Sequence, residues 1–195
     1  GDTYNVAIGF NAMGSSTTGG ASVAMGGGAM GSNTTGGSNT ALGYFALTSN
    51  TTASNNTAVG KSALYANTTG ASNTAVGSQA ADAISTGSNN TAVGQGALTN
   101  GTTCDYNTAV GVNALQDATT GSDNNAFGRQ ALANNTTQNS NCAFGSTALF
   151  TQIDGGTKNC AFGNSTLYSN TTGDSNCAFG DAALYTNTTG TRNVA

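Results

Sequence analysis

Four cysteines and eight aspartates are the residues of this sequence that could do chemistry, and their spacing builds no catalytic site. The chain has no histidine, so a Ser-His-Asp or Cys-His nucleophile cannot form. The acids are Asp2, Asp82, Asp105, Asp117, Asp123, Asp154, Asp174 and Asp181. They fall at different positions of the repeat described below, so no carboxylate pair is placed by it. We therefore predict no enzyme activity, no catalytic residue, no metal site and no cofactor.

The cysteines have an ordered spacing. Cys142, Cys160 and Cys177 occupy one position in three consecutive repeats. If the repeats stack about 4.8 Å apart, the Cα atoms of neighbours lie within disulfide range. Three thiols cannot all pair, so we favour the interpretation that they are small buried apolar residues beside phenylalanine. Cys104 stands alone in a turn, where it could be a free thiol or a link between chains.

Asn-Thr-Thr, an N-glycosylation sequon, recurs at one repeat position that we expect on an outer turn. The asparagines are Asn33, Asn50, Asn67, Asn135, Asn170 and Asn187. One interpretation is an extracellular filament with one glycan per repeat. The other, which we favour, is that Asn, Thr and Gly simply suit turns.

These residues are positioned by a repeat that fills residues 1–195. Its marker, Ala-apolar-Gly, ends at Gly9, Gly26, Gly43, Gly60, Gly77, Gly94, Gly111, Gly128, Gly145, Gly163 and Gly180. The period is 17 residues, with one 18-residue repeat around 146–163. The consensus is Asn-Thr-Ala-Val-Gly-x-x-Ala-Leu-x-x-Asn-Thr-Thr-Gly-x-x. We predict a single repeat array that is a segment of a longer fibre.

A repeat of 17 residues is too short for helical repeats, which need about 33 to 47. Its Gly, Asn, Thr and β-branched residues also disfavour helix. A coil of strand, turn, strand and turn fits this length. The predicted fold class is therefore all-β, a parallel β-solenoid (β-roll or β-helix) of about 11.5 coils and about 55 Å length.

Alternation along each strand predicts which columns face inward. The fourth repeat position is always apolar, and we predict that it is the core column, together with the second position. Its residues are Ile8, Met25, Leu42, Val59, Val76, Val93, Val110, Phe127, Phe144, Phe162 and Phe179. A second inward column is the leucine of Ala-Leu, with Ala81 as the exception.

The asparagine that begins each repeat predicts a ladder of amides along the axis. Its members include Asn39, Asn56, Asn73, Asn90, Asn107, Asn124, Asn141, Asn159 and Asn176. The glycine after the core column is expected to take a positive φ or to allow a tight turn.

Composition limits the partners. Only 6% of residues are charged, and the formal net charge is −4. Four basic residues cannot neutralise a phosphate backbone, so we expect no nucleic-acid binding. No apolar run approaches the roughly 20 residues of a membrane span. Because each coil buries few apolar side chains, we expect other copies of the chain as partners, as a homotrimer or an end-to-end filament.

The motif Asn-Thr-Ala-Val-Gly-x-x-Ala-Leu resembles the head repeats of trimeric autotransporter adhesins, whose core is Val-Ala-Ile-Gly. It is also similar to repeat regions of bacteriophage tail-fibre proteins. The resemblance implies a left-handed roll, three chains about one axis and attachment to host surfaces, with glycans as candidate partners. The adhesin repeats are shorter than those of this chain.

The predicted function is a structural or adhesive fibre segment: a filament, tail-fibre shaft or adhesin head, extracellular or on a cell or virion surface. The alternative is an ice-binding β-solenoid, because ranks of threonine can order water. Tyr65, Phe150, Tyr168 and Tyr185 share one repeat position. They could form a sugar-binding stripe or merely cover a neighbouring coil.

Overall fold

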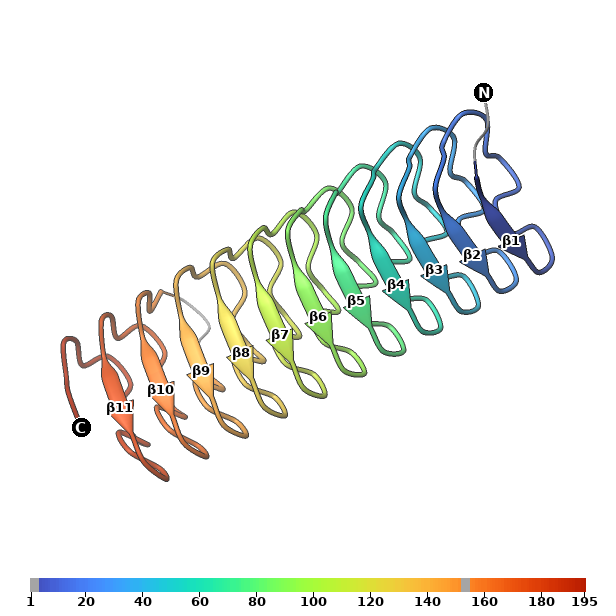
Figure 1. The fold of residues 1–195 in the computed structure, drawn as a ribbon. Coiled ribbons are helices and arrows are strands. Elements are labelled where there is room, and N and C mark those ends of the chain that lie inside the picture. Colours follow the sequence, from blue (N-terminus) through green and yellow to red (C-terminus); the bar gives the residue numbers. More distant parts are fainter. Residues whose placement is uncertain (1–3, 152–154) are drawn as a thin grey trace.

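One parallel β-sheet of eleven short strands runs along the molecule (Figure 1). The computed structural model describes residues 4–151 and 155–195. Within these ranges the chain has no helix, and the strands follow one another in chain order. They are β1 (Val6–Ile8), β2 (Val23–Met25), β3 (Thr40–Leu42), β4 (Thr57–Val59), β5 (Thr74–Val76), β6 (Thr91–Val93), β7 (Thr108–Val110), β8 (Asn125–Phe127), β9 (Cys142–Phe144), β10 (Cys160–Phe162) and β11 (Cys177–Phe179). The predicted parallel β-solenoid is confirmed.

The strands pair in register, one repeat apart. Val59 lies opposite Val76, which lies opposite Val93. The register also holds across the 18-residue repeat, where Cys142 pairs with Cys160. Residues 152–154 of that repeat lie outside the described residues. Like residues therefore form continuous columns along the axis.

Each coil contains one strand rather than the predicted two, and the rest of the coil is turns. Gly43 has a φ of 142°, as expected, but Phe45, Leu47 and Asn55 also have positive φ, at 55°, 51° and 64°. A left-handed residue other than glycine costs about 1–2 kcal/mol. Hydrogen bonds to the next coil offset this cost: the Leu47 amide, for example, donates to the Ala63 carbonyl at 2.9 Å. Stacking thus maintains a conformation that an isolated coil would avoid.

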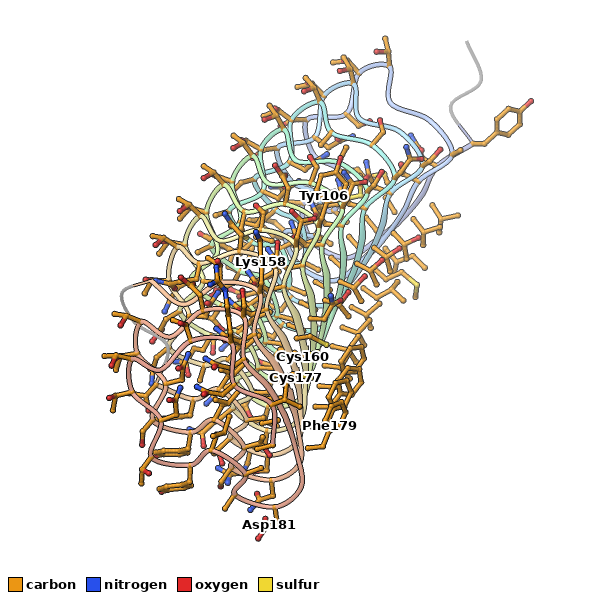
Figure 2. All side chains as sticks on the ribbon, turned by 90° about the vertical axis from the view of Figure 1, so that its left-hand side faces the viewer. Tyr106, Lys158, Cys160, Cys177, Phe179 and Asp181 are labelled. Carbon is orange, nitrogen blue, oxygen red and sulfur yellow. The ribbon has the colours of Figure 1, made fainter. Side chains whose placement is uncertain are left out.

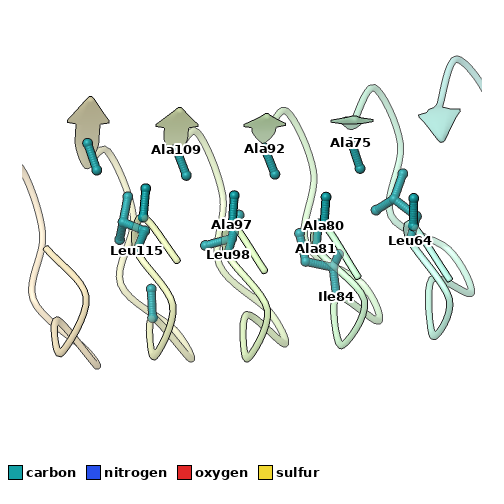
Figure 3. Packing of buried hydrophobic residues seen from close by; sticks show 14 of the residues in the cluster. Leu64, Ala75, Ala80, Ala81, Ile84, Ala92, Ala97, Leu98, Ala109 and Leu115 are labelled. Atoms are coloured by element: carbon teal, nitrogen blue, oxygen red, sulfur yellow. The ribbon is translucent and has the colours of Figure 1, made fainter. Parts of the chain in front are cut away.

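The apolar part of the interior is made mainly of alanine and leucine (Figure 3). The middle alanine of a strand, such as Ala75 or Ala92, is 0% exposed, and so is Ala97, which faces it from the turns. The predicted leucine column is confirmed as buried at Leu47, Leu64, Leu98, Leu115, Leu132, Leu149 and Leu167, while Leu184 is half-buried.

The predicted core column is wrong. Ile8, Met25, Leu42, Val59, Val76, Val93, Val110, Phe127, Phe144, Phe162 and Phe179 point outward and are half-buried or exposed. The reason is the size of the coil interior. The sheet and the facing turns lie so close that a methyl group fills the space behind the strand, so alanine faces inward. Because side chains alternate, the residues on either side of it must face outward.

Candidate functional surface

The asparagines that begin each repeat form a buried ladder, as predicted, but the bonds run mainly between side chain and backbone. The Asn73 amide N–H donates to Asn56 Oδ1 at 2.9 Å, and Asn56 Nδ2 donates to the Gly70 carbonyl at 2.9 Å. The same pattern recurs in neighbouring coils, and these side chains are essentially inaccessible. Each side chain therefore joins the turn at the end of its own repeat to the first residue of the next repeat.

The sequon asparagines form a second ladder inside the coil. Asn50 Nδ2 donates to Asn33 Oδ1 at 2.8 Å, and Asn67 Nδ2 donates to Asn50 Oδ1 at 3.1 Å. The prediction that these amides lie on an outer turn, open to a glycan, is wrong: Asn33, Asn50, Asn67, Asn135 and Asn170 are buried, and Asn187 is half-buried. The nitrogen that would carry the sugar is already a donor within the fold, so the turn interpretation is the better one.

The second ladder is interrupted in three consecutive coils, where Ile84, Gly101 and Ala118 replace asparagine. This interruption was not predicted from the sequence. In one coil Ile84 occupies the asparagine column, and Ala81 beside it occupies the leucine column (Figure 3). The large apolar side chain of this coil therefore lies in the asparagine column instead of the leucine column. In the following coil, Cys104 fills the space beside Gly101, where an added Cβ would lie 2.9 Å from the Cys104 sulfur. The sequence did contain a signal for these exchanges, since each coil departs from the consensus at two positions at once: Ala81 with Ile84, and Gly101 with Cys104. Residues that share one packed volume are expected to change together in this way.

All four cysteines are free thiols. Cys104 is fully buried, so a link through it to another chain is excluded in the folded state. Burial, with a smaller contribution from the charge of Asp105, raises the pKa of Cys104 to about 11. Cys142, Cys160 and Cys177 are half-buried rather than buried as predicted, because they belong to an outward column. Burial also raises the pKa of Cys142 to about 11.

The first and third residues of strands β1 to β11 form a continuous surface, which we call the outer sheet face. None of these residues is fully buried. Val76 and Phe144 are each 37% exposed, Met25 43% and Phe179 58%. No strand residue from β1 to β11, all of which the structure describes, carries a charge. Phe179 lies at the end of a row of rings that projects from the ribbon in Figure 2.

The central part of the outer sheet face pairs threonine with aliphatic residues. In β4, β5 and β6 the outward side chains are Thr57 with Val59, Thr74 with Val76, and Thr91 with Val93. Among the described residues no protein acceptor binds these threonine hydroxyls. In the turns, by contrast, Thr51 Oγ1 donates to the Thr68 carbonyl at 3.1 Å.

Two rows of outward aromatic residues stack along the axis. The rings of Phe127, Phe144, Phe162 and Phe179 lie 4.4–5.0 Å apart and nearly parallel. Phe150, Tyr168 and Tyr185 stack in the same way at 5.0–5.2 Å, and Tyr65 lies edge-on to Phe45. Since rings within a stack cover one another's faces, this favours the covering role of these residues over a sugar-binding stripe.

Other candidate sites are weak. A polar hollow of about 270 Å³ is lined by Lys158, Asp174 and Arg192 with neighbouring hydroxyls. The Asp174 carboxylate already accepts a hydrogen bond from the Thr157 amide at 2.6 Å.

In the described part of the chain, no cluster of three or more His, Cys, Asp or Glu is placed to hold a metal ion. No helix long and apolar enough to cross a membrane was found among those residues. Asp2 and Asp154 lie outside them.

Fold and surface define a parallel β-solenoid repeat protein with an uncharged outer sheet face. No family model, curated protein or solved structure matches the chain. The resemblance to adhesin heads and tail-fibre repeats, with its left hand and its three chains, stays a prediction.

Proposed function

We propose that this chain is a structural segment of an extracellular fibre, in which the solenoid acts as a stiff rod on a cell or virion surface. Adhesion through its flanks would be the associated activity. The observation that carries the proposal is the unbroken register of eleven strands. Backbone hydrogen bonds join each strand to the next, and the buried asparagine that begins nearly every repeat adds a further bond, with Ser22 in its place in one coil.

Stiffness follows from the way these bonds are arranged. Bending the rod would stretch the bonds of several columns at once, including the buried amides of Asn56, Asn73 and Asn90. Buried hydrogen bonds are costly to leave unmade, about 1–3 kcal/mol each. A chain that resists bending in this way is suited to holding its ends apart.

Immuno-electron microscopy of producing cells or particles tests the location. Antibodies against the folded protein should label surface appendages without permeabilisation, and pre-immune serum should not. Labelling that appears only after permeabilisation would contradict the proposal.

A second candidate function is ice binding, favoured by one observation. The threonine column of β3 to β7 was expected to be buried, yet it lies on the outer sheet face beside an aliphatic column. In β4 to β6 the threonine hydroxyls have no protein acceptor among the described residues. Regular methyl and hydroxyl groups on a rigid surface could order water. The test is thermal hysteresis of the wild-type protein against Thr74→Lys, with Thr86→Lys in an exposed turn as control. An absence of hysteresis in the wild type would exclude this function.

A further inference from the structure

We propose that the outer sheet face is the surface on which a second copy of this chain packs, with the two solenoid axes side by side. The inference rests on the proposed fibre function, because it names the partner that covers the flank of the rod. It differs from end-to-end stacking, in which the outer sheet face would stay open to water.

Exposed apolar surface is the first argument. Ile8, Met25, Val76, Phe144 and Phe179 are each at least 37% exposed, and they belong to a single column. Contiguous apolar patches of more than a few hundred Å² are rare on monomers and mark interaction sites. The partner must therefore be largely apolar where it meets this column.

Charge distribution is the second argument. The outer sheet face has no charged residue in any strand, whereas Lys61, Arg129 and Asp181 lie two residues beyond the ends of their strands. An uncharged centre with charges at its edge is the usual anatomy of a protein interface. A second copy presents the same uncharged face, so no charge is buried when the two meet.

The spacing of the outward side chains along the axis is the third argument, and it indicates which partner covers the outer sheet face. The outward side chains form ridges that repeat once per strand, and neighbouring strands lie about 4.8 Å apart. A partner must match these ridges across eleven strands without drifting out of step. Another copy of this chain has the same spacing by construction.

Size is sufficient for such a contact. Eleven strands about 4.8 Å apart and about 10 Å wide present roughly 500 Å² per copy, or about 1,000 Å² in a pair. That total is near the lower limit for a specific interface. Side chains flanking the strands, such as Tyr44 and Val112, are also exposed and could enlarge it.

The mass of the protein in solution tests the proposal. Light scattering after size-exclusion chromatography should give a mass at least twice that of one 19.0 kDa chain. Val76→Lys with Val93→Lys should restore the single-chain mass, while Thr86→Lys with Thr103→Lys, on exposed turns of the same region, should not. Because the replaced valines point outward, the variants should keep the wild-type circular dichroism.

Cross-linking locates the contact. In a cysteine-free background (Cys104→Ala, with Cys142, Cys160 and Cys177 replaced by threonine), Thr91→Cys places one thiol on β6, the middle strand of the face. Diamide should join two such thiols, each losing a proton and an electron, and give a covalent dimer on a non-reducing gel. The control Thr86→Cys should give none.

The outcomes separate the inference from the function. A folded wild-type monomer at micromolar concentration would overturn the inference and leave the proposed rod function standing. An oligomer unaffected by the two valine substitutions, with no Thr91→Cys dimer, would also overturn it. Surface labelling by immuno-electron microscopy is independent of either result.

Discussion

Ile84 shows how single residues adjust the inside of a coil. It replaces an asparagine of the second ladder, and Asn67 Oδ1, at the same repeat position in the preceding coil, is buried without a hydrogen-bond partner. A buried unsatisfied acceptor costs about 1–3 kcal/mol. The same coil has Ala81 where other coils have leucine, so Ile84 supplies the missing apolar volume. One substitution therefore affects both packing and hydrogen bonding.

Restoring the consensus in two steps tests this account. Ile84→Asn alone should lower the free energy of unfolding by about 3 kcal/mol, because it leaves a cavity beside Ala81. Adding Ala81→Leu should recover that loss and gain about 1 kcal/mol, since the new side-chain amide at position 84 could then donate to Asn67 Oδ1. Urea unfolding of the two single variants and the double variant measures the coupling. Additive effects would contradict the proposed exchange of volume.

The buried thiol of Cys104 predicts a loss of stability in alkali. Its pKa is about 11 in the folded chain, against an ordinary value of 9.0. Below pH 9 the thiol is protonated in both states; between pH 9 and 11 it ionises mainly in the unfolded chain, which favours unfolding. Urea unfolding across this range should show a steeper loss for the wild type than for Cys104→Ala. Equal slopes would show that this thiol does not contribute.

At the scale of the element, each coil is one strand held between tight turns and its two neighbours. The recurring geometry at the end of each strand is a glycine with a φ of 125–142°. A Cβ added to Gly94 would lie 2.5 Å from the Gly111 carbonyl oxygen of the next coil. The backbones therefore approach too closely for a side chain, so glycine is required both for its φ and for its size.

Two glycine variants separate these requirements. Gly180 has the same backbone conformation, but an added Cβ would meet no atom within 4 Å. Gly180→Ala should thus destabilise only through strain, by about 1–3 kcal/mol. Gly94→Ala should lower the free energy of unfolding by the same strain and by about 1–3 kcal/mol more, because its methyl group would clash with the Gly111 carbonyl. Thermal unfolding compares the two, and equal losses would argue against close backbone approach as the limiting factor.

The sequence predicted the strand that begins each repeat, its period and the role of glycine, because these depend on local spacing. The second strand expected in each coil is replaced by turns in the described residues. It did not predict which face of the strand is inside. Alternation distinguishes Ala75 from its neighbours Thr74 and Val76 but does not say which set is buried, and residue size alone wrongly favours the larger residues as the core. The width of the coil decides this, and it depends on the turns. Leu64 has a φ of 50° there, a conformation that leucine rarely adopts and that no propensity predicts.

At the scale of the whole molecule, stability comes from contacts between adjacent coils. Every strand from β2 to β10 pairs only with the strand before it and the strand after it. Such solenoids behave as a sum of coil terms and nearest-neighbour terms. Removing a coil should therefore matter much less than breaking the register between two coils.

Deletion of residues 78–94 removes one complete 17-residue coil and joins Gly77 to Gln95, which repeats the natural link between Gly94 and Gln95. Strand β5 would then pair with β7, and both would keep their outward and inward faces. We expect an unchanged circular dichroism per residue and a midpoint of thermal unfolding lower by roughly a few degrees.

Deletion of only residues 78–85 leaves too short a chain to complete a coil, so β5 and β6 cannot pair. That variant should unfold at a much lower temperature or in two steps. If the two deletions were equally destabilising, the register of the columns would not be what holds this molecule together.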